Sequence, residues 1–123
     1  MIGVLGAGKM GEALTSGLLR AGVPPAMVIA AVRREERAAA LRDAYGIEVL
    51  SAAEAAARAQ TLVITVKPQD MAALLDQIAP QVSADKLVIS VAAGITTAFI
   101  ERRLAGDVPV VRVLSLIHIS EPT

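Results

Sequence analysis

Three glycines near the start of the chain constrain its fold more than any other feature. They form the stretch Gly6-Ala-Gly-Lys-Met-Gly11, which follows the short apolar run 2–5. Residues 9–21 then carry apolar or small side chains at helical spacing. An apolar run, a glycine-rich turn and an amphipathic segment, in that order, predict a strand, a tight turn and a helix. This is the opening of a βαβ unit.

The same alternation continues to the end of the chain. Strands are predicted at residues 2–5, 27–32, 47–50, 61–66, 86–91 and 108–114. Helices are predicted at residues 9–21, 34–45, 51–59, from Pro68 onward, and 96–104. Helical connections of this length join parallel strands. The sequence therefore predicts an α/β protein with one dinucleotide-binding domain over residues 1–113, a doubly wound, Rossmann-like parallel sheet of about six strands.

Composition excludes several classes of protein. Although 54% of the residues are hydrophobic, no apolar run reaches the roughly 18–20 residues of a membrane span. The chain has no cysteine, which excludes a disulfide framework and thiolate chemistry. The formal net charge is zero and there is no basic run, so nucleic acid is not expected as a partner. With no signal-peptide pattern at the start, the simplest interpretation is a cytoplasmic protein without a membrane segment.

The glycine stretch matches the G-x-G-x-x-G fingerprint of dinucleotide binding, in the structural context that the fingerprint requires. Gly6 would permit the tight turn, Gly8 the close approach of a pyrophosphate, and Gly11 close packing of helix on strand. The helix N-terminus would offer free N–H groups to the phosphates. The alternative is a glycine-rich turn that binds no ligand. The candidate cofactor contacts here are Gly6, Ala7, Gly8, Lys9, Met10 and Gly11, with Lys9 also readable as a solvent-facing side chain.

The end of the second strand distinguishes between the two nicotinamide dinucleotides. NAD-binding domains place an acid about 20 residues after the glycines, where it holds the ribose 2′-hydroxyl. Here Val32 stands at that distance and Arg33 and Arg34 follow it. Guanidinium groups pair with a 2′-phosphate, so NADP(H) is predicted as the preferred cofactor and NAD(H) as a possible one. The alternative is that both arginines are solvated, or are paired with the acids at 35–36.

The carboxyl ends of two further strands supply the remaining candidates, because ligands of open parallel sheets bind beyond those ends. They are Thr65, Val66, Lys67, Pro68, Ala92, Ala93 and Gly94. The small residues 92–94 would let a nicotinamide ring lie close to backbone, or would form only a tight turn. No metal-ligand cluster is visible, and the catalytic residues stay unknown. His118 is the only histidine, and Asp70, Asp76 and Asp85 are interpreted as surface carboxylates.

Residues 1–113 resemble the N-terminal part of pyrroline-5-carboxylate reductases. The resemblance rests on GAGKMGEAL and SGLLRAG within residues 6–22, VKPQDM at 66–71, KLVISVAAGI at 86–95 and PVVRV at 109–113. It implies an NAD(P)H-dependent oxidoreductase that reduces the C=N bond of 1-pyrroline-5-carboxylate, giving L-proline in proline biosynthesis. One departure is Ala53, where the family often has an asparagine near the adenosine.

A larger departure follows residue 113. The family continues with Met-Pro-Asn-Thr-Pro and a helical domain, which carries the dimer interface and most of the substrate pocket. Here that domain is absent, and residues 114–123 read LSLIHISEPT, which we interpret as a sequencing or cloning artefact. The resemblance thus implies a fragment that is inactive alone, from a parent that forms a homo-oligomer through the missing domain.

Two other functions stay open at this point. One is another NADP-dependent oxidoreductase, of the β-hydroxyacid dehydrogenase or deazaflavin-dependent type. The other is a nucleotide-binding module without catalysis, which the lack of a visible catalytic group favours. The stretches at 66–71 and 86–95 favour pyrroline-5-carboxylate reduction over the other oxidoreductases.

Overall fold

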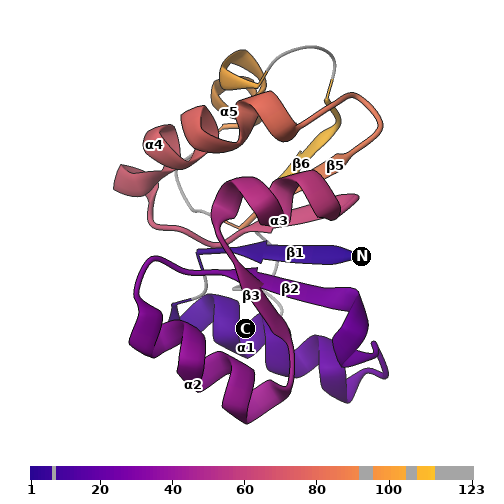
Figure 1. The fold of residues 1–123 in the computed structure, drawn as a ribbon. Coiled ribbons are helices and arrows are strands. Elements are labelled where there is room, and N and C mark those ends of the chain that lie inside the picture. The colour runs from indigo at the N-terminus through magenta and orange to yellow at the C-terminus, as the bar shows by residue number, and fades with distance from the viewer. Residues whose placement is uncertain (7, 92–95, 105–107, 113–123) are drawn as a thin grey trace, which may run out of the picture.

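The computed structural model describes residues 1–6, 8–91, 96–104 and 108–112, and these form one sheet covered by helices on both faces (Figure 1). The strands are β1 (Ile2–Leu5), β2 (Val28–Ala31), β3 (Glu48–Leu50), β4 (Thr61–Ile64), β5 (Leu87–Ser90) and β6 (Val110–Arg112). The helices are α1 (Lys9–Arg20), α2 (Glu35–Tyr45), α3 (Ala52–Arg58), α4 (Pro68–Ile78) and α5 (Thr97–Arg103). Short 3₁₀ helices span Pro25–Met27 and Ala79–Gln81.

The sheet has the strand order β3-β2-β1-β4-β5-β6, and every neighbouring pair is parallel. The chain moves outward from β1 to β3 on one side, then returns to pair β4 with the other edge of β1. This reversal creates a crevice beyond the carboxyl ends of β1 and β4, the position where open α/β sheets bind ligands. The predicted fold class, a doubly wound parallel sheet of six strands, is confirmed.

Two apolar cores lie on the two faces of the sheet. In β1, Val4 belongs to the core with α1 and α2, whereas Leu5 belongs to the core with α3, α4 and α5. Figure 1 shows these two groups of helices on opposite sides of the strands. Since neighbouring residues of a strand point to opposite faces, a strand covered on both sides must be apolar throughout. This explains the short, unbroken apolar runs of the sequence.

Local signals set the ends of several helices. Gly46 ends α2 with a φ of +68°, a conformation that costs glycine little. Ser51 caps α3, accepting a 3.2 Å hydrogen bond from the backbone N–H of Glu54. In place of the reciprocal bond of a capping box, the Ser51 hydroxyl donates to the Glu54 carboxylate at 3.0 Å. One face of α4 is apolar and buried, and its residues are Met71, Leu74, Leu75 and Ile78.

Strand boundaries differ from the prediction by one or two residues. Met27, predicted as the first residue of the second strand, instead lies in a 3₁₀ turn and is 43% exposed. The preceding Pro24-Pro25 pair favours this turn, because proline suits the first position of such a helix. Lys86, predicted to start the fifth strand, precedes it and is buried. Its ammonium group donates to the carbonyls of Ala57 and Ala59, at 3.1 and 2.7 Å, and so caps the end of α3.

None of the helices in the described ranges has both the length and the apolar character needed to cross a membrane.

Candidate functional site

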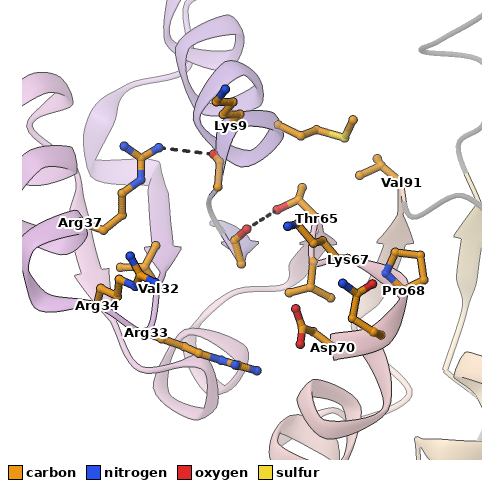
Figure 2. Close-up of a pocket in the computed structure, with 15 residues that line it drawn as sticks. Lys9, Val32, Arg33, Arg34, Arg37, Thr65, Lys67, Pro68, Asp70 and Val91 are labelled. Carbon is orange, nitrogen blue, oxygen red and sulfur yellow. Dashed lines mark hydrogen bonds between the residues drawn. The ribbon is translucent and has the colours of Figure 1, made fainter.

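A cleft of about 900 Å³ lies beyond the carboxyl ends of β1, β2, β4 and β5 (Figure 2). It occupies the crevice made by the reversal of strand order between β1 and β4. Its lining comes from the glycine turn, the β2–α2 loop, the β4–α4 loop and the residue after β5. These residues are Gly6, Gly8, Lys9, Met10, Val32, Arg33, Arg34, Arg37, Thr65, Val66, Lys67, Pro68, Gln69, Asp70 and Val91.

The turn at Gly6 is tightly held by its neighbours. Gly6 has a φ of +82°, and its N–H donates a 2.9 Å hydrogen bond to the carbonyl of Ala31. A Cβ atom at this position would overlap Cγ1 of Val66 and lie 3.2 Å from the backbone nitrogen of that residue. The hydroxyl of Thr65 lies 2.9 Å from the carbonyl oxygen of Leu5 and 3.0 Å from that of Gly6. The end of β4 therefore fixes the turn that follows β1.

Gly8 differs from Gly6 in having open space beside it. Apart from its chain neighbours and the nearby backbone of α1, a Cβ atom on Gly8 would meet no atom of the described residues within 4 Å. Gly8 is also the N-cap of α1, and no side chain caps this end of the helix. The first N–H groups of a helix lack intrahelical partners and carry a partial positive charge. Open space in front of an uncapped helix N-terminus fits a phosphate group.

Positive charge is concentrated in the cleft, although the whole chain has a formal net charge of zero. Within the described lining, five side chains are cationic and one, Asp70, is acidic. The cations are Lys9, Arg33, Arg34, Arg37 and Lys67. Such a balance favours an anionic ligand.

Arg33 and Arg34 lie on the loop between β2 and α2, and both are exposed. In the ranges that the structure describes, neither side chain makes an ion pair or a hydrogen bond. The acid beside them, Glu35, pairs with Arg42 at 3.1 Å. Figure 2 shows Arg33 extending toward the side of the cleft that carries Asp70. The position of a ribose-binding acid is held by Val32, which also lines the cleft.

Arg37, in the first turn of α2, reaches back toward the glycine turn (Figure 2). Its guanidinium donates to the carboxylate of Glu12 on α1 and, at 3.5 Å, to the carbonyl of Gly8. The other oxygen of Glu12 accepts a 2.7 Å hydrogen bond from the hydroxyl of Tyr45. The Tyr45 hydroxyl, followed by the Arg37 guanidinium, lowers the pKa of Glu12 below its ordinary value of 4.5.

The structure brings most of the sequence-predicted residues to one place. Those in the lining are Gly6, Gly8, Lys9, Met10, Arg33, Arg34, Thr65, Val66, Lys67 and Pro68. Gly11 does not line the cleft and is buried in α1, where its carbonyl accepts a 2.9 Å hydrogen bond from Thr15. Ala7, Ala92, Ala93, Gly94 and the tail 114–123 with His118 lie outside the described residues.

Sequence reasoning missed Arg37, Gln69 and Val91 as lining residues. Asp70, interpreted from the sequence as a surface carboxylate, also lines the cleft, from the first turn of α4. The signal for Gln69 and Asp70 was present, since they directly follow the Lys67-Pro68 pair at the end of a strand. In the part of the chain that the structure describes, no cluster of three or more His, Cys, Asp or Glu side chains is arranged to hold a metal.

A known family model matches most of the chain. Residues 1–94 match the family described as NADP oxidoreductase, coenzyme F420-dependent. The matched range includes the glycine turn, the β2–α2 loop and the β4–α4 loop, and therefore all the residues that line the cleft.

Curated relatives and solved structures point to a narrower group. The chain is 36% identical over 118 residues to the pyrroline-5-carboxylate reductase of Mycobacterium leprae, covering 92% of this chain and 40% of that protein. It is 40% identical over 112 residues to the Pseudomonas aeruginosa reductase, covering 90% and 41%. A pyrroline-5-carboxylate reductase structure from Coxiella burnetii matches with a TM-score of 0.85 and 26% identity, covering 90% and 42%. The resemblance stated from the sequence motifs is confirmed, and the chain spans about two fifths of these proteins' length.

Proposed function

Because the chain belongs to the family of NADP oxidoreductases described as coenzyme F420-dependent, we propose that it is the cofactor-binding part of a reductase that converts 1-pyrroline-5-carboxylate to L-proline. The curated relatives support this substrate. Residues 1–113 form the proposed dinucleotide-binding domain. The rest of the parent protein would supply most of the substrate pocket and the contacts of a homo-oligomer. Nucleic acid is not a proposed partner, and a cytoplasmic location is part of the proposal.

One observation carries the choice of cofactor. The crevice of a parallel sheet here combines an uncapped helix N-terminus with Arg33 and Arg34, and Val32 replaces the acid that would hold a free 2′-hydroxyl. NADP(H) supplies a pyrophosphate for the helix N-terminus and a 2′-phosphate for the two arginines. NAD(H) supplies only the pyrophosphate. The residues present therefore fit NADP(H) better than NAD(H).

We assign Lys67 to a phosphate or the ribose of the cofactor, and Pro68 and Val91 to its nicotinamide end. Lys67, Pro68 and Val91 lie beyond β4 and β5, across the crevice from the arginines. When bound, NADPH supplies the hydride that goes to the imine carbon, while a proton goes to the nitrogen, giving the secondary amine of proline and NADP⁺. The part of this chain is to hold and orient the donor, which is a large share of catalysis when two reactants must meet in one geometry.

The two arginines provide a direct test of the cofactor. The double variant Arg33→Ala/Arg34→Ala is expected to weaken NADPH binding about tenfold, since exposed charge-assisted contacts to the 2′-phosphate are lost. NADH binding should change by less than about twofold, because NADH has no such phosphate. Both dissociation constants can be measured by nucleotide fluorescence at fixed ionic strength.

A matched control is the double variant Arg102→Ala/Arg103→Ala. These neighbouring arginines lie in the last turn of α5 and do not line the cleft. Their replacement removes the same two positive charges as the Arg33/Arg34 variant does, and NADPH affinity should stay at the wild-type value. An equal loss of NADPH and NADH affinity in the Arg33/Arg34 variant would contradict the assignment of these residues to the 2′-phosphate.

The reaction is tested with the intact parent gene. It is expected to rescue a proline auxotroph, and the purified parent should form L-proline from 1-pyrroline-5-carboxylate and NADPH. The chain of residues 1–123 alone should bind NADPH without forming proline, because most of the substrate pocket belongs to the remaining domain. Steady proline formation by the isolated chain would refute that division of labour.

The family match favours one second candidate. Residues 1–94 match a model named for coenzyme F420, so hydride transfer between NADP(H) and a deazaflavin is the alternative reaction. The two candidates share the proposed dinucleotide site and differ in the second substrate. A parent protein that reduces a deazaflavin with NADPH and forms no proline would replace the first candidate by the second.

A further inference from the structure

Glu12, Arg37 and Tyr45 form a hydrogen-bonded network that lies next to the cleft. Glu12 is in the first turn of α1, Arg37 in the first turn of α2, and Tyr45 is the last residue of α2. Eight positions separate the two α2 residues, which is about 12 Å along a helix. Both nevertheless contact one carboxylate, through its two different oxygens. The single carboxylate of Glu12 therefore ties both ends of α2 to the first turn of α1.

The groups are in the protonation states that the network needs at neutral pH. Tyr45 and Arg37 lower the pKa of Glu12, so the carboxylate is ionised and accepts from both partners. The hydrogen bond to Glu12 raises the pKa of the Tyr45 hydroxyl, which therefore keeps its proton and acts as the donor. A charged acceptor with two donors makes stronger hydrogen bonds than neutral groups do.

Arg37 differs from the other arginines of the cleft. Its charge faces the Glu12 carboxylate, whereas Arg33 and Arg34 have no ion pair in the described ranges. Its guanidinium also reaches the carbonyl of Gly8, the residue at the uncapped start of α1. Arg37 thus links the helix that follows the two arginines to the glycine turn. Its place in the cleft fits a residue that sets distances between elements.

We propose that Glu12, Arg37 and Tyr45 are positioning residues that hold the glycine turn and the Arg33-Arg34 loop at the spacing of the two phosphate groups of an NADP-type dinucleotide. This inference rests on the proposed function. Its consequence is selective: a ligand that spans both anion sites depends on the spacing, and a ligand that occupies only the glycine turn does not. Tyr45 does not line the cleft, so any effect of its hydroxyl on ligand choice passes through Glu12 and Arg37.

The test compares two ligands on the chain of residues 1–123. The probe 2′,5′-ADP carries one phosphate on the 2′ oxygen and one on the 5′ oxygen of its ribose, whereas ADP carries only the 5′-diphosphate. Tyr45→Phe and Glu12→Gln are each expected to weaken 2′,5′-ADP binding about fivefold, and ADP binding by less than about twofold. The double variant should lose little more than the stronger single variant, because both act on one network. Calorimetric titration of the wild type and the three variants with each ligand gives the dissociation constants.

The matched control is Glu48→Gln. Glu48 pairs with Arg58 in a comparable carboxylate–guanidinium contact on β3, outside the cleft lining. This variant should leave the ratio of the two ligands unchanged. Thermal unfolding of each variant shows whether the fold is retained. A variant whose unfolding temperature falls below that of the binding experiment is replaced by Arg37→Lys. Lysine keeps the charge but cannot bridge the Glu12 carboxylate and the Gly8 carbonyl.

Each outcome has a defined meaning. Equal weakening of both ligands would reduce the network to a structural role and overturn the proposal. Folded variants that bind both ligands with wild-type affinity would overturn it as well. Tighter 2′,5′-ADP binding by Glu12→Gln would make Arg37 a direct phosphate ligand that Glu12 restrains, and would also overturn it. A wild-type chain that binds 2′,5′-ADP no better than ADP would remove the cofactor assignment itself, so the two failures are distinguishable.

Discussion

Replacing Gly6 by alanine is expected to lower the free energy of unfolding by about 2–5 kcal/mol and to abolish nucleotide binding. The first part of the cost is the left-handed backbone conformation, with φ at +82°. The second is steric, because the added Cβ atom would overlap the side chain of Val66. Relief of this overlap must move the glycine turn or the end of β4, and both line the cleft. Urea denaturation and NADPH titration measure the two effects.

A second substitution separates the two causes. In Gly6→Ala/Val66→Ala the overlap with Cγ1 of residue 66 is removed, while the 3.2 Å approach to the backbone nitrogen of that residue and the backbone strain of about 1–2 kcal/mol remain. The double variant should therefore be less destabilised than the sum of the two single variants. If the losses in free energy of unfolding of the two single variants simply added, the Val66 side chain would not clash with the alanine. The backbone of the turn would then account for the whole effect.

Replacing Gly8 by alanine is expected to lower NADPH affinity strongly and stability only slightly. The φ of Gly8, −79°, lies outside the left-handed region that favours glycine, and the new methyl group would meet no side chain of the described residues within 4 Å. Stability should fall by about 1 kcal/mol or less, the cost of losing a glycine N-cap. NADPH affinity should fall about 10- to 100-fold, because the methyl group takes the space in which the pyrophosphate approaches the start of α1.

The pair of variants distinguishes a structural glycine from a ligand-binding one within three residues of sequence. If Gly8→Ala bound NADPH with wild-type affinity, the pyrophosphate would not lie at this helix terminus, and the proposed orientation of the dinucleotide would be wrong. Both variants are compared by the same two measurements, urea denaturation and NADPH titration, on the same chain.

Much of the fold could be predicted because the central strands β1, β2 and β4 are apolar on both faces, and because α1 and α4 carry apolar residues at helical spacing. Val4 and Leu5 face different cores, and a sequence with two such cores leaves few alternatives to a doubly wound sheet. The ends of elements were less certain. The 3₁₀ turn that takes Met27 out of β2 depends on local proline geometry, which hydrophobic periodicity does not report.

The site could be predicted where it follows from topology, and not where it depends on contacts between distant residues. The glycine turn and the ends of β2 and β4 must meet in any sheet with this connectivity. Arg37 was missed because residues 33–37 read Arg-Arg-Glu-Glu-Arg, and sequence alone does not say which of these charges faces the crevice. Its partner Glu12 is 25 positions away, and Tyr45 is 33 positions from Glu12.

The central place of β1 has a consequence for how the chain acquires its structure during synthesis. β1 is made first, yet it pairs on one side with β2, through Ile2 and Val28, and on the other with β4, through Ile2 and Thr61. Contacts between residues this far apart in sequence form slowly, since a long loop must close before they do. The glycine turn is thus translated long before Thr65, the residue that fastens it. A nascent chain that ends before β4 holds the fingerprint without the cleft.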